Sequence, residues 1–260
     1  MQNELKIALI QSDLVWENPK ENCDQFTKKI SDIPEEVDVI VLPEMFTTGF
    51  TMNAAKVAER MHGDSVAWMQ EMAKKTNAAI IGSLVIEEHK SYYNRLLFVE
   101  PSGYISKYDK RHTFTLVGED KIYKAGTEKV IINYKDWKIS PLICYDLRFP
   151  VWSRNKENYD VLIYVANWPS VRIQAWNTLL KARAIENISY VIVINRVCTD
   201  ANKHLYSGNS MAIDFLGDDL ASLQENEAGI IQTTLLKTTL QDTRKKLGFL
   251  NDMDDFKINI

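Results

Sequence analysis

The sequence predicts a layered domain that mixes α-helices with β-strands. Runs rich in Val, Ile and Leu recur along the whole length of the 260-residue chain. Some of these runs are continuous, as is typical of strands buried on both faces, and others alternate with polar residues, as is typical of hairpins. Stretches with the spacing of amphipathic helices lie between them. This interleaving favours sheets that are covered by helices.

The expected strands and helices follow one another along the chain. Strands are expected at residues 5–10, 37–42, 78–86, 92–99, 104–108, 129–134, 137–144, 161–166, 190–197 and 210–215, with a last pair between 220 and 236. Helices are expected at residues 18–32, 54–75 and 172–187, with a helical tail from about 238. Turns are expected at 101–103 and 135–136. The chain shows no repeat and no linker, so residues 1–260 are expected to form a single domain.

Composition and charge narrow the class of protein. The chain is 45% hydrophobic and 25% charged, which is ordinary for a soluble globular protein. A formal net charge of -4 provides no basic field for nucleic acid or an anionic membrane. Its apolar runs are too short to span a bilayer, and we see no signal peptide, so a cytoplasmic protein is expected. The three cysteines are far apart, which disfavours a disulfide framework or a zinc site, and no metal or other cofactor is expected.

Cys144 stands at the end of an apolar run. A short polar turn follows it, and then Pro150, which is suited to open a helix. A thiol at such a strand-to-helix turn is expected to be exposed, and nearby helix amides would favour its thiolate form. Taken alone, a cysteine is more often an inert buried side chain, and that interpretation suits Cys23 and Cys198.

Two other strand ends carry groups that could act together with this thiol. Glu44 follows the buried run 39–42, and a carboxylate whose pKa is raised by burial can act as a base. Lys110 follows the strand at 104–108 and could stabilise an oxyanion with the backbone N–H after Cys144. Each residue alone is more simply explained as a turn residue or a solvated strand end. His112 is the alternative base.

Three segments together resemble the signature blocks of the nitrilase, or carbon–nitrogen hydrolase, superfamily. They are Leu42-Pro-Glu-Met-Phe46, Tyr108-Asp-Lys-Arg-His112 and Ile143-Cys-Tyr-Asp-Leu-Arg-Phe-Pro150. The resemblance implies an α+β fold, a four-layer α-β-β-α sandwich of two mixed sheets flanked by helices. It further implies a homodimer.

The same resemblance assigns roles to four residues. Glu44 corresponds to the general base, Lys110 to the oxyanion-stabilising lysine and Cys144 to the nucleophile. Glu119 matches the position of a second active-site glutamate.

Further segments resemble the omega-amidase branch of this superfamily. They are residues 167–169, 182–187 and 206–210, whereas Gly248 stands where a proline is expected. This resemblance implies a cysteine amidase that cleaves the terminal amide of a small dicarboxylate monoamide, such as 2-oxoglutaramate or succinamate, through a thioester. Another carbon–nitrogen hydrolase, such as an N-carbamoyl amino acid amidohydrolase or a nitrilase, stays open. So does a non-catalytic thiol sensor.

A substrate that carries a carboxylate requires a cation in the pocket. Arg172 is the predicted anchor, because a guanidinium binds a carboxylate bidentately, although a surface position at a helix start fits equally well. Phe46, Trp168 and Tyr145 are expected to supply apolar walls, although aromatic residues in a core need no such role. Arg148 is expected to support the turn that presents Cys144.

Overall fold

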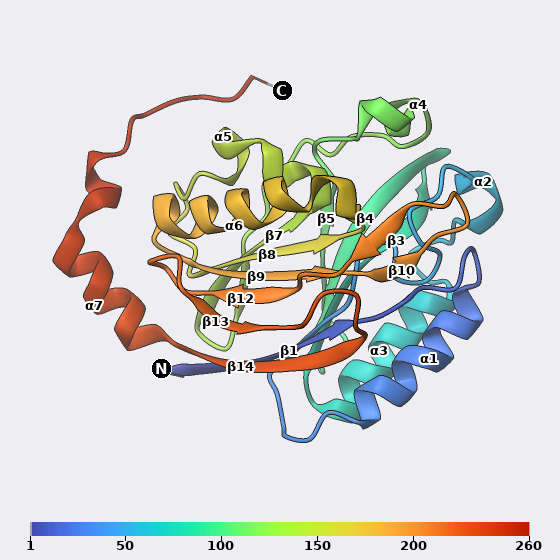
Figure 1. Cartoon of the computed structure of the whole chain (residues 1–260), viewed down its shortest axis with the longest axis horizontal. Helices are drawn as coiled ribbons and strands as arrows, with labels where there is room; N and C mark the ends of the chain where they lie inside the picture. Colours follow the sequence, from blue (N-terminus) through green and yellow to red (C-terminus); the bar gives the residue numbers. More distant parts are fainter. Residues whose placement is uncertain (1, 260) are drawn as a thin grey trace.

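The computed structural model describes residues 2–259 and contains two six-stranded sheets (Figure 1). The first sheet has the order β14-β1-β2-β3-β4-β5, with bounds Gly229–Leu236, Glu4–Gln11, Val39–Val41, Ala79–Glu88, Ser91–Val99 and Ile105–Asp109. The second has the order β13-β12-β9-β8-β7-β6, with bounds Asp219–Ser222, Met211–Ile213, Tyr190–Asn195, Val161–Ala166, Trp137–Ile143 and Ile132–Tyr134. A separate ribbon pairs β10 (Val197–Thr199) with β11 (Leu205–Ser207).

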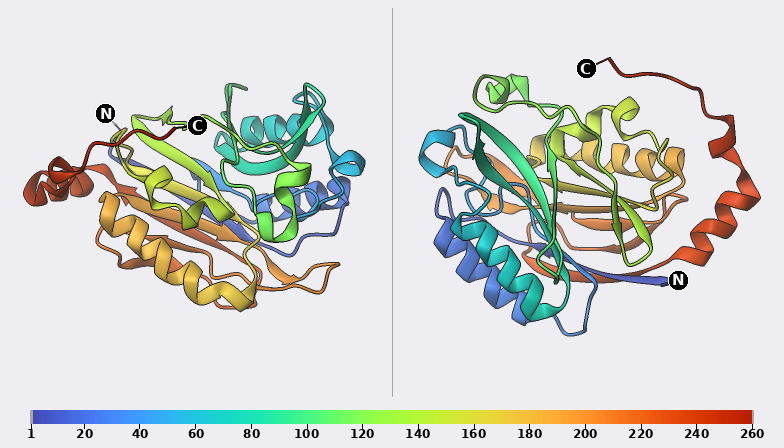
Figure 2. Two further views of the ribbon diagram at one scale, coloured as in Figure 1. Left: turned by 90° about the horizontal axis from the view of Figure 1, so that it is seen from above. Right: turned by 180° about the vertical axis from the view of Figure 1, so that it is seen from behind.

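Helices cover the outer faces of both sheets. Figures 1 and 2 show α1 (Pro19–Ser31) and α3 (Asp64–Thr76) on one side and α6 (Ile173–Asn187) on the other. The predicted α-β-β-α layering is therefore confirmed. The shorter helices are α2 (Ala54–Val57), α4 (Glu119–Ile122), α5 (Pro150–Ser153) and α7 (Lys237–Leu247), and the 3-10 turns are η1 (Thr115–Val117), η2 (Cys144–Arg148), η3 (Ser170–Arg172) and η4 (Phe249–Asp252). None of the helices within 2–259 is both long and apolar enough to cross a membrane.

The continuous apolar runs form strands that are buried on both faces. On β1, Ile7 and Leu9 belong to the core between the two sheets, whereas Ala8 and Ile10 pack in a second core with α1 and α3. This division follows from the alternation of successive side chains along a strand. One run of apolar residues thus joins two layers, which explains why these strands carry no polar face.

The parallel strands direct several chain segments to one edge of the sandwich. β1, β2 and β3 are parallel to one another, as are β7, β8 and β9. Parallel strands end at a common edge, where a rigid sheet gives way to turns. The segments that follow β2, β5, β7 and β8 meet at this edge, and they carry Glu44, Lys110, Cys144 and Asn167.

The structure corrects three of the predicted elements. The helix expected at 54–75 is divided into α2 and α3, because the chain between them forms an isolated bridge from Glu59 to Ile86. The strand expected at 190–197 is interrupted at Arg196, whose guanidinium reaches Asp13. The two last strands do not pair with each other, since β13 pairs with β12 and β14 pairs with β1. Local patterns cannot reveal such partners, because they are distant in sequence.

Candidate active site

Glu44, Lys110 and Cys144 line one cavity of about 190 Å³. Glu119, the fourth residue predicted to act with them, contacts the Lys110 ammonium. Glu44 and Lys110 follow strands of the first sheet, and Cys144 follows a strand of the second. The cavity therefore lies where the ends of the two sheets meet.

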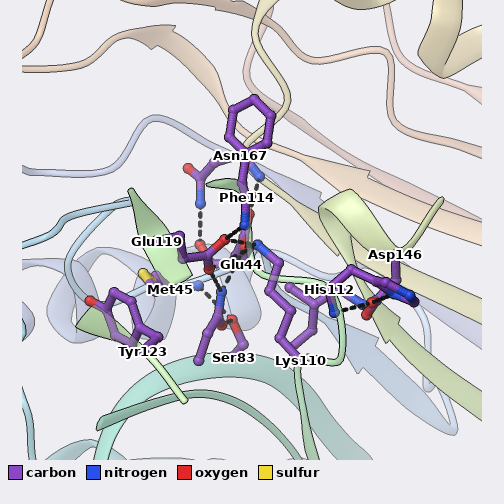
Figure 3. A network of polar contacts seen from close by, with 12 residues as sticks. Glu44, Met45, Ser83, Lys110, His112, Phe114, Glu119, Tyr123, Asp146 and Asn167 are labelled. Carbon is purple, nitrogen blue, oxygen red and sulfur yellow. Dashed lines mark hydrogen bonds and ion pairs between the residues drawn. The ribbon is translucent and has the colours of Figure 1, made fainter. Parts of the chain in front are cut away.

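Lys110 is buried between two carboxylates (Figure 3). Its Nζ lies 3.0 Å from Oε1 of Glu44 and 2.9 Å from Oε2 of Glu119. Burial by itself lowers the pKa of Lys110, but the charges of Glu119 and Glu44 outweigh it and raise that pKa. Burial also raises the pKa of Glu119, against the opposing effect of Lys110. The site thus keeps a permanent ammonium next to closely spaced carboxyl groups.

Glu44 is held in place by hydrogen bonds from two directions. Its Oε1 accepts from Nδ2 of Asn94 at 2.8 Å, and its Oε2 accepts from the backbone N–H of Asn167 at 2.8 Å. The Asn94 side chain is fixed in turn, because its Oδ1 accepts from the Ser83 hydroxyl at 2.8 Å. The Ser83 Oγ accepts from the backbone N–H of Met45 at 2.8 Å. This network fixes the orientation of the carboxylate.

Cys144 begins η2 directly after β7, in an unusual backbone conformation. Its φ of +43° lies in the left-handed region, which costs energy for a residue other than glycine. The buried carboxylate of Asp146 holds this turn by accepting from the Ile143 N–H at 3.1 Å, the His112 N–H at 2.9 Å and the Tyr108 hydroxyl at 2.7 Å. The strained turn is therefore supported by a carboxylate whose donors come from β5, the segment after it and the end of β7.

The environment of the Cys144 thiol differs from the expectation of an exposed thiolate. The residue is only 9% exposed. Burial and the nearby charge of Glu44 raise the pKa of the Cys144 thiol well above its ordinary value, although Lys110 acts in the opposite direction. A raised pKa favours the protonated thiol, and a base that removes its proton would make it a nucleophile.

His112 does not line the cavity. Its Nδ1 lies 2.8 Å from Oδ1 of Asp146, and its ring stacks on Phe149 at 3.7 Å. The ring therefore supports the η2 turn, whereas Glu44 lines the cavity together with Cys144. Cys198 also departs from expectation, because it is exposed rather than buried.

Three of the four residues predicted to bind substrate line the cavity, namely the anchor Arg172 and the wall residues Tyr145 and Trp168. Phe46 does not, and its assignment as a pocket wall is corrected by the structure. Its ring packs against Phe26 and Trp68, each at 5.6 Å, on the outer side of the first sheet. The backbone after Glu44 turns sharply, with Met45 at a φ of +43°, and this turn separates Phe46 from the cavity.

Two residues, Asn94 and Arg148, were not assigned to the site from the sequence. Asn94 gave no distinct signal, because the charged Arg95 follows it directly in β4 and makes this part of the strand polar. Arg148 was expected only to support a turn, but it lines the cavity with its guanidinium 4.9 Å from the Trp168 ring. The guanidinium of Arg172 lies 5.1 Å from the Phe114 ring. Within residues 2–259, neither arginine has a carboxylate partner.

Comparison with known proteins decides the family. The model of the Carbon-nitrogen hydrolase family matches residues 6–245. This chain belongs to that family. An omega-amidase YafV of Yersinia enterocolitica is 44% identical over 252 residues, covering 97% of this chain and 98% of the relative. A 2-oxoglutaramate amidase of Bacillus subtilis is 33% identical, covering 95% of this chain and 96% of its own length.

A solved structure agrees with these sequence relatives. A carbon-nitrogen hydrolase superfamily protein of Xanthomonas campestris, which holds an arsenic adduct in its active site, superposes with a TM-score of 0.97 at 38% identity. The match covers 99% of this chain and 100% of the other. The protein is therefore a hydrolase of non-peptide carbon–nitrogen bonds, of the amidase type.

Proposed function

We propose that this protein is a cysteine-dependent amidase that removes the terminal amide of a small dicarboxylate monoamide and releases ammonia. 2-Oxoglutaramate and succinamate are representative substrates. The observation that carries the proposal is the buried grouping of Glu44, Lys110 and Cys144 in a small cavity whose lining also includes two arginines. Relatives named omega-amidase and 2-oxoglutaramate amidase support it.

The first half of the reaction forms a thioester. Glu44 takes the proton of the Cys144 thiol, and the thiolate attacks the amide carbon of the substrate. The negative charge that develops on the amide oxygen is stabilised by the Lys110 ammonium and the backbone N–H of Tyr145. Glu44 then passes its proton to the nitrogen, the carbon–nitrogen bond breaks, and ammonia leaves.

The second half restores the enzyme. Glu44 takes a proton from a water molecule, and the resulting hydroxide attacks the thioester carbon. Lys110 and the Tyr145 N–H stabilise the oxyanion again. The carbon–sulfur bond breaks, the proton returns to the Cys144 sulfur, and a dicarboxylate is released. Glu119 positions Lys110 throughout, because it contacts the Nζ through both carboxylate oxygens.

The remaining walls of the cavity suit a short chain with a charged end. Arg172, the anchor predicted from the sequence, and Arg148 can each bind the substrate carboxylate, and neither is neutralised by a carboxylate within residues 2–259. Trp168 and Tyr145 provide apolar surface for the methylene groups between the two ends. A volume of about 190 Å³ restricts the substrate to a small molecule.

We also propose that residues 1–260 act as one catalytic domain and pair into a homodimer in the cytoplasm. A core shared by both sheets supports the single domain. Exposed apolar side chains support pairing. Val171, just before α6, is 86% exposed, Ile185 on α6 is 53% exposed, and Phe249, after α7, is 59% exposed. Free cysteines suit a reducing compartment.

A panel of substrates tests the activity. Ammonia release should be faster from succinamate and 2-oxoglutaramate than from neutral amides, nitriles and N-carbamoyl amino acids. Cys144→Ala should abolish it, and Glu44→Gln should lower kcat by roughly a hundredfold. Mass spectrometry of quenched reactions should detect an acyl adduct on Cys144.

Several outcomes would contradict the proposal. Parental rates in Cys144→Ala would exclude the mechanism. A preference for nitriles or N-carbamoyl compounds would favour another carbon–nitrogen hydrolase. Labelling of Cys144 by thiol reagents without turnover of any compound would favour a thiol sensor.

A further inference from the structure

The lining of the catalytic cavity includes a histidine that the mechanism above does not use. His204 lies in the loop between β10 and β11 and lines the cavity together with Tyr206. It also lines an adjoining hollow of about 220 Å³, so its side chain forms part of the wall between the two. This side chain is 54% exposed. A substrate whose amide reaches the buried Cys144 would extend its other end toward such exposed residues.

Asp200 fixes the orientation of this histidine. Its buried carboxylate accepts from the backbone N–H of His204 at 2.9 Å, the backbone N–H of Asn202 at 2.9 Å and the Tyr206 hydroxyl at 3.0 Å. The Nδ1 of His204 lies 3.2 Å from Oδ2 of Asp200. Because a carboxylate can only accept hydrogen bonds, this contact places a proton on Nδ1. The other ring nitrogen, Nε2, has no hydrogen-bond partner within the described chain.

The charges around the cavity are unevenly distributed. The carboxylate that lines it, Glu44, is paired with Lys110. The lining also includes Arg148 and Arg172, which have no carboxylate partner within residues 2–259, together with His204. The nearby carboxylate of Asp200 already accepts hydrogen bonds from three donors of its own loop and strand. An anionic group at the far end of a substrate would therefore lie near two guanidinium groups without a carboxylate partner and near the Nε2 of His204, which is a donor when both ring nitrogens carry protons.

We propose that His204 is a substrate-binding residue whose Nε2–H donates a hydrogen bond to the distal carboxylate of the amide substrate. The inference rests on the proposed function, since it requires a carboxylated amide. Donation from Nε2 requires that both ring nitrogens carry protons. The resulting imidazolium would lie between the Asp200 carboxylate and the substrate carboxylate, which is the arrangement of a charge-assisted hydrogen bond. Asp200 acts as the positioning residue, because it touches His204 rather than the substrate.

Two substrates of equal chain length test this role. Succinamate carries the distal carboxylate, and butyramide has a methyl group in its place. His204→Ala should raise KM for succinamate about tenfold, with kcat changed less than about twofold, because a hydrogen bond between charged groups is lost. The same variant should leave kcat/KM for butyramide unchanged. His204→Gln retains a neutral N–H donor and should recover part of the loss.

Asn202→Ala is the matched control, because Asn202 lies in the same loop but lines only the adjoining hollow. Its KM for succinamate should equal that of the parental enzyme. An unchanged KM in His204→Ala, or equal losses on both amides, would overturn the role of His204 while leaving the amidase intact. If the parental enzyme does not prefer succinamate to butyramide, the proposed function fails, and this inference fails with it.

Discussion

Replacing Lys110 with Met should lower both kcat and the free energy of unfolding, and the loss of stability should depend on pH. The ammonium of Lys110 lies 3.0 Å from Glu44 and 2.9 Å from Glu119, and all three side chains are buried. Met preserves the length of the side chain but removes its charge. Two carboxyl groups would then remain together, each in contact with Asn94, at 2.8 and 3.4 Å.

The magnitudes follow from these contacts. Loss of an oxyanion donor should lower kcat by roughly a hundredfold to a thousandfold. Breaking a buried ion pair by removing one partner costs about 3–5 kcal/mol of the free energy of unfolding. The pKa of Glu119 is already raised by burial, and without Lys110 it should rise further. A carboxyl group with a raised folded-state pKa supports folding while it is protonated, and this support is lost as pH rises through that pKa.

Thermal melting followed by circular dichroism, combined with ammonia release from saturating succinamate, measures both effects. The Tm difference between Lys110→Met and the parental protein should be smallest near pH 5 and should grow toward pH 8. The double variant Lys110→Met/Glu119→Gln should regain much of the stability but none of the activity. A Tm loss that is equal at every pH, or a double variant no more stable than the single one, would refute the reasoning.

Two further predictions concern the nucleophile and its turn. In a Cys198→Ser background, iodoacetamide should alkylate Cys144 slowly at neutral pH and faster as pH rises, because the pKa of this thiol is raised; Glu44→Gln should shift that profile to lower pH. Peptide mass spectrometry provides the rates, and a rate independent of pH would contradict the raised pKa. Asp146→Ala should destabilise the protein by about 2–4 kcal/mol in urea unfolding, because buried donors lose their acceptor. A loss below about 1 kcal/mol would show that the turn at Cys144 does not depend on this carboxylate.

The sequence predicted the fold, and it predicted a candidate site at strand ends, because both predictions depend on short segments. Continuous apolar runs such as 39–42 and 161–166 carry enough information to predict buried strands, whatever their partners. The three signature segments placed Glu44, Lys110 and Cys144 at strand ends. Because strands in a sheet are rigid, the positions of these residues relative to their strands were already determined.

Only the tertiary structure decided which groups surround these residues. Asn94 reaches Glu44 because β4 lies in the same sheet as β2, with β3 between them, and its position in the sequence gives no indication of that contact. The backbone turn at Met45 removes Phe46 from the cavity, although it is only two residues from Glu44. Burial sets the pKa of Cys144, and burial is the sum of contacts from both sheets. The sequence by itself determined which chemical groups are present at the strand ends, and the packing of the two sheets determined their protonation, their neighbours and the walls of the cavity.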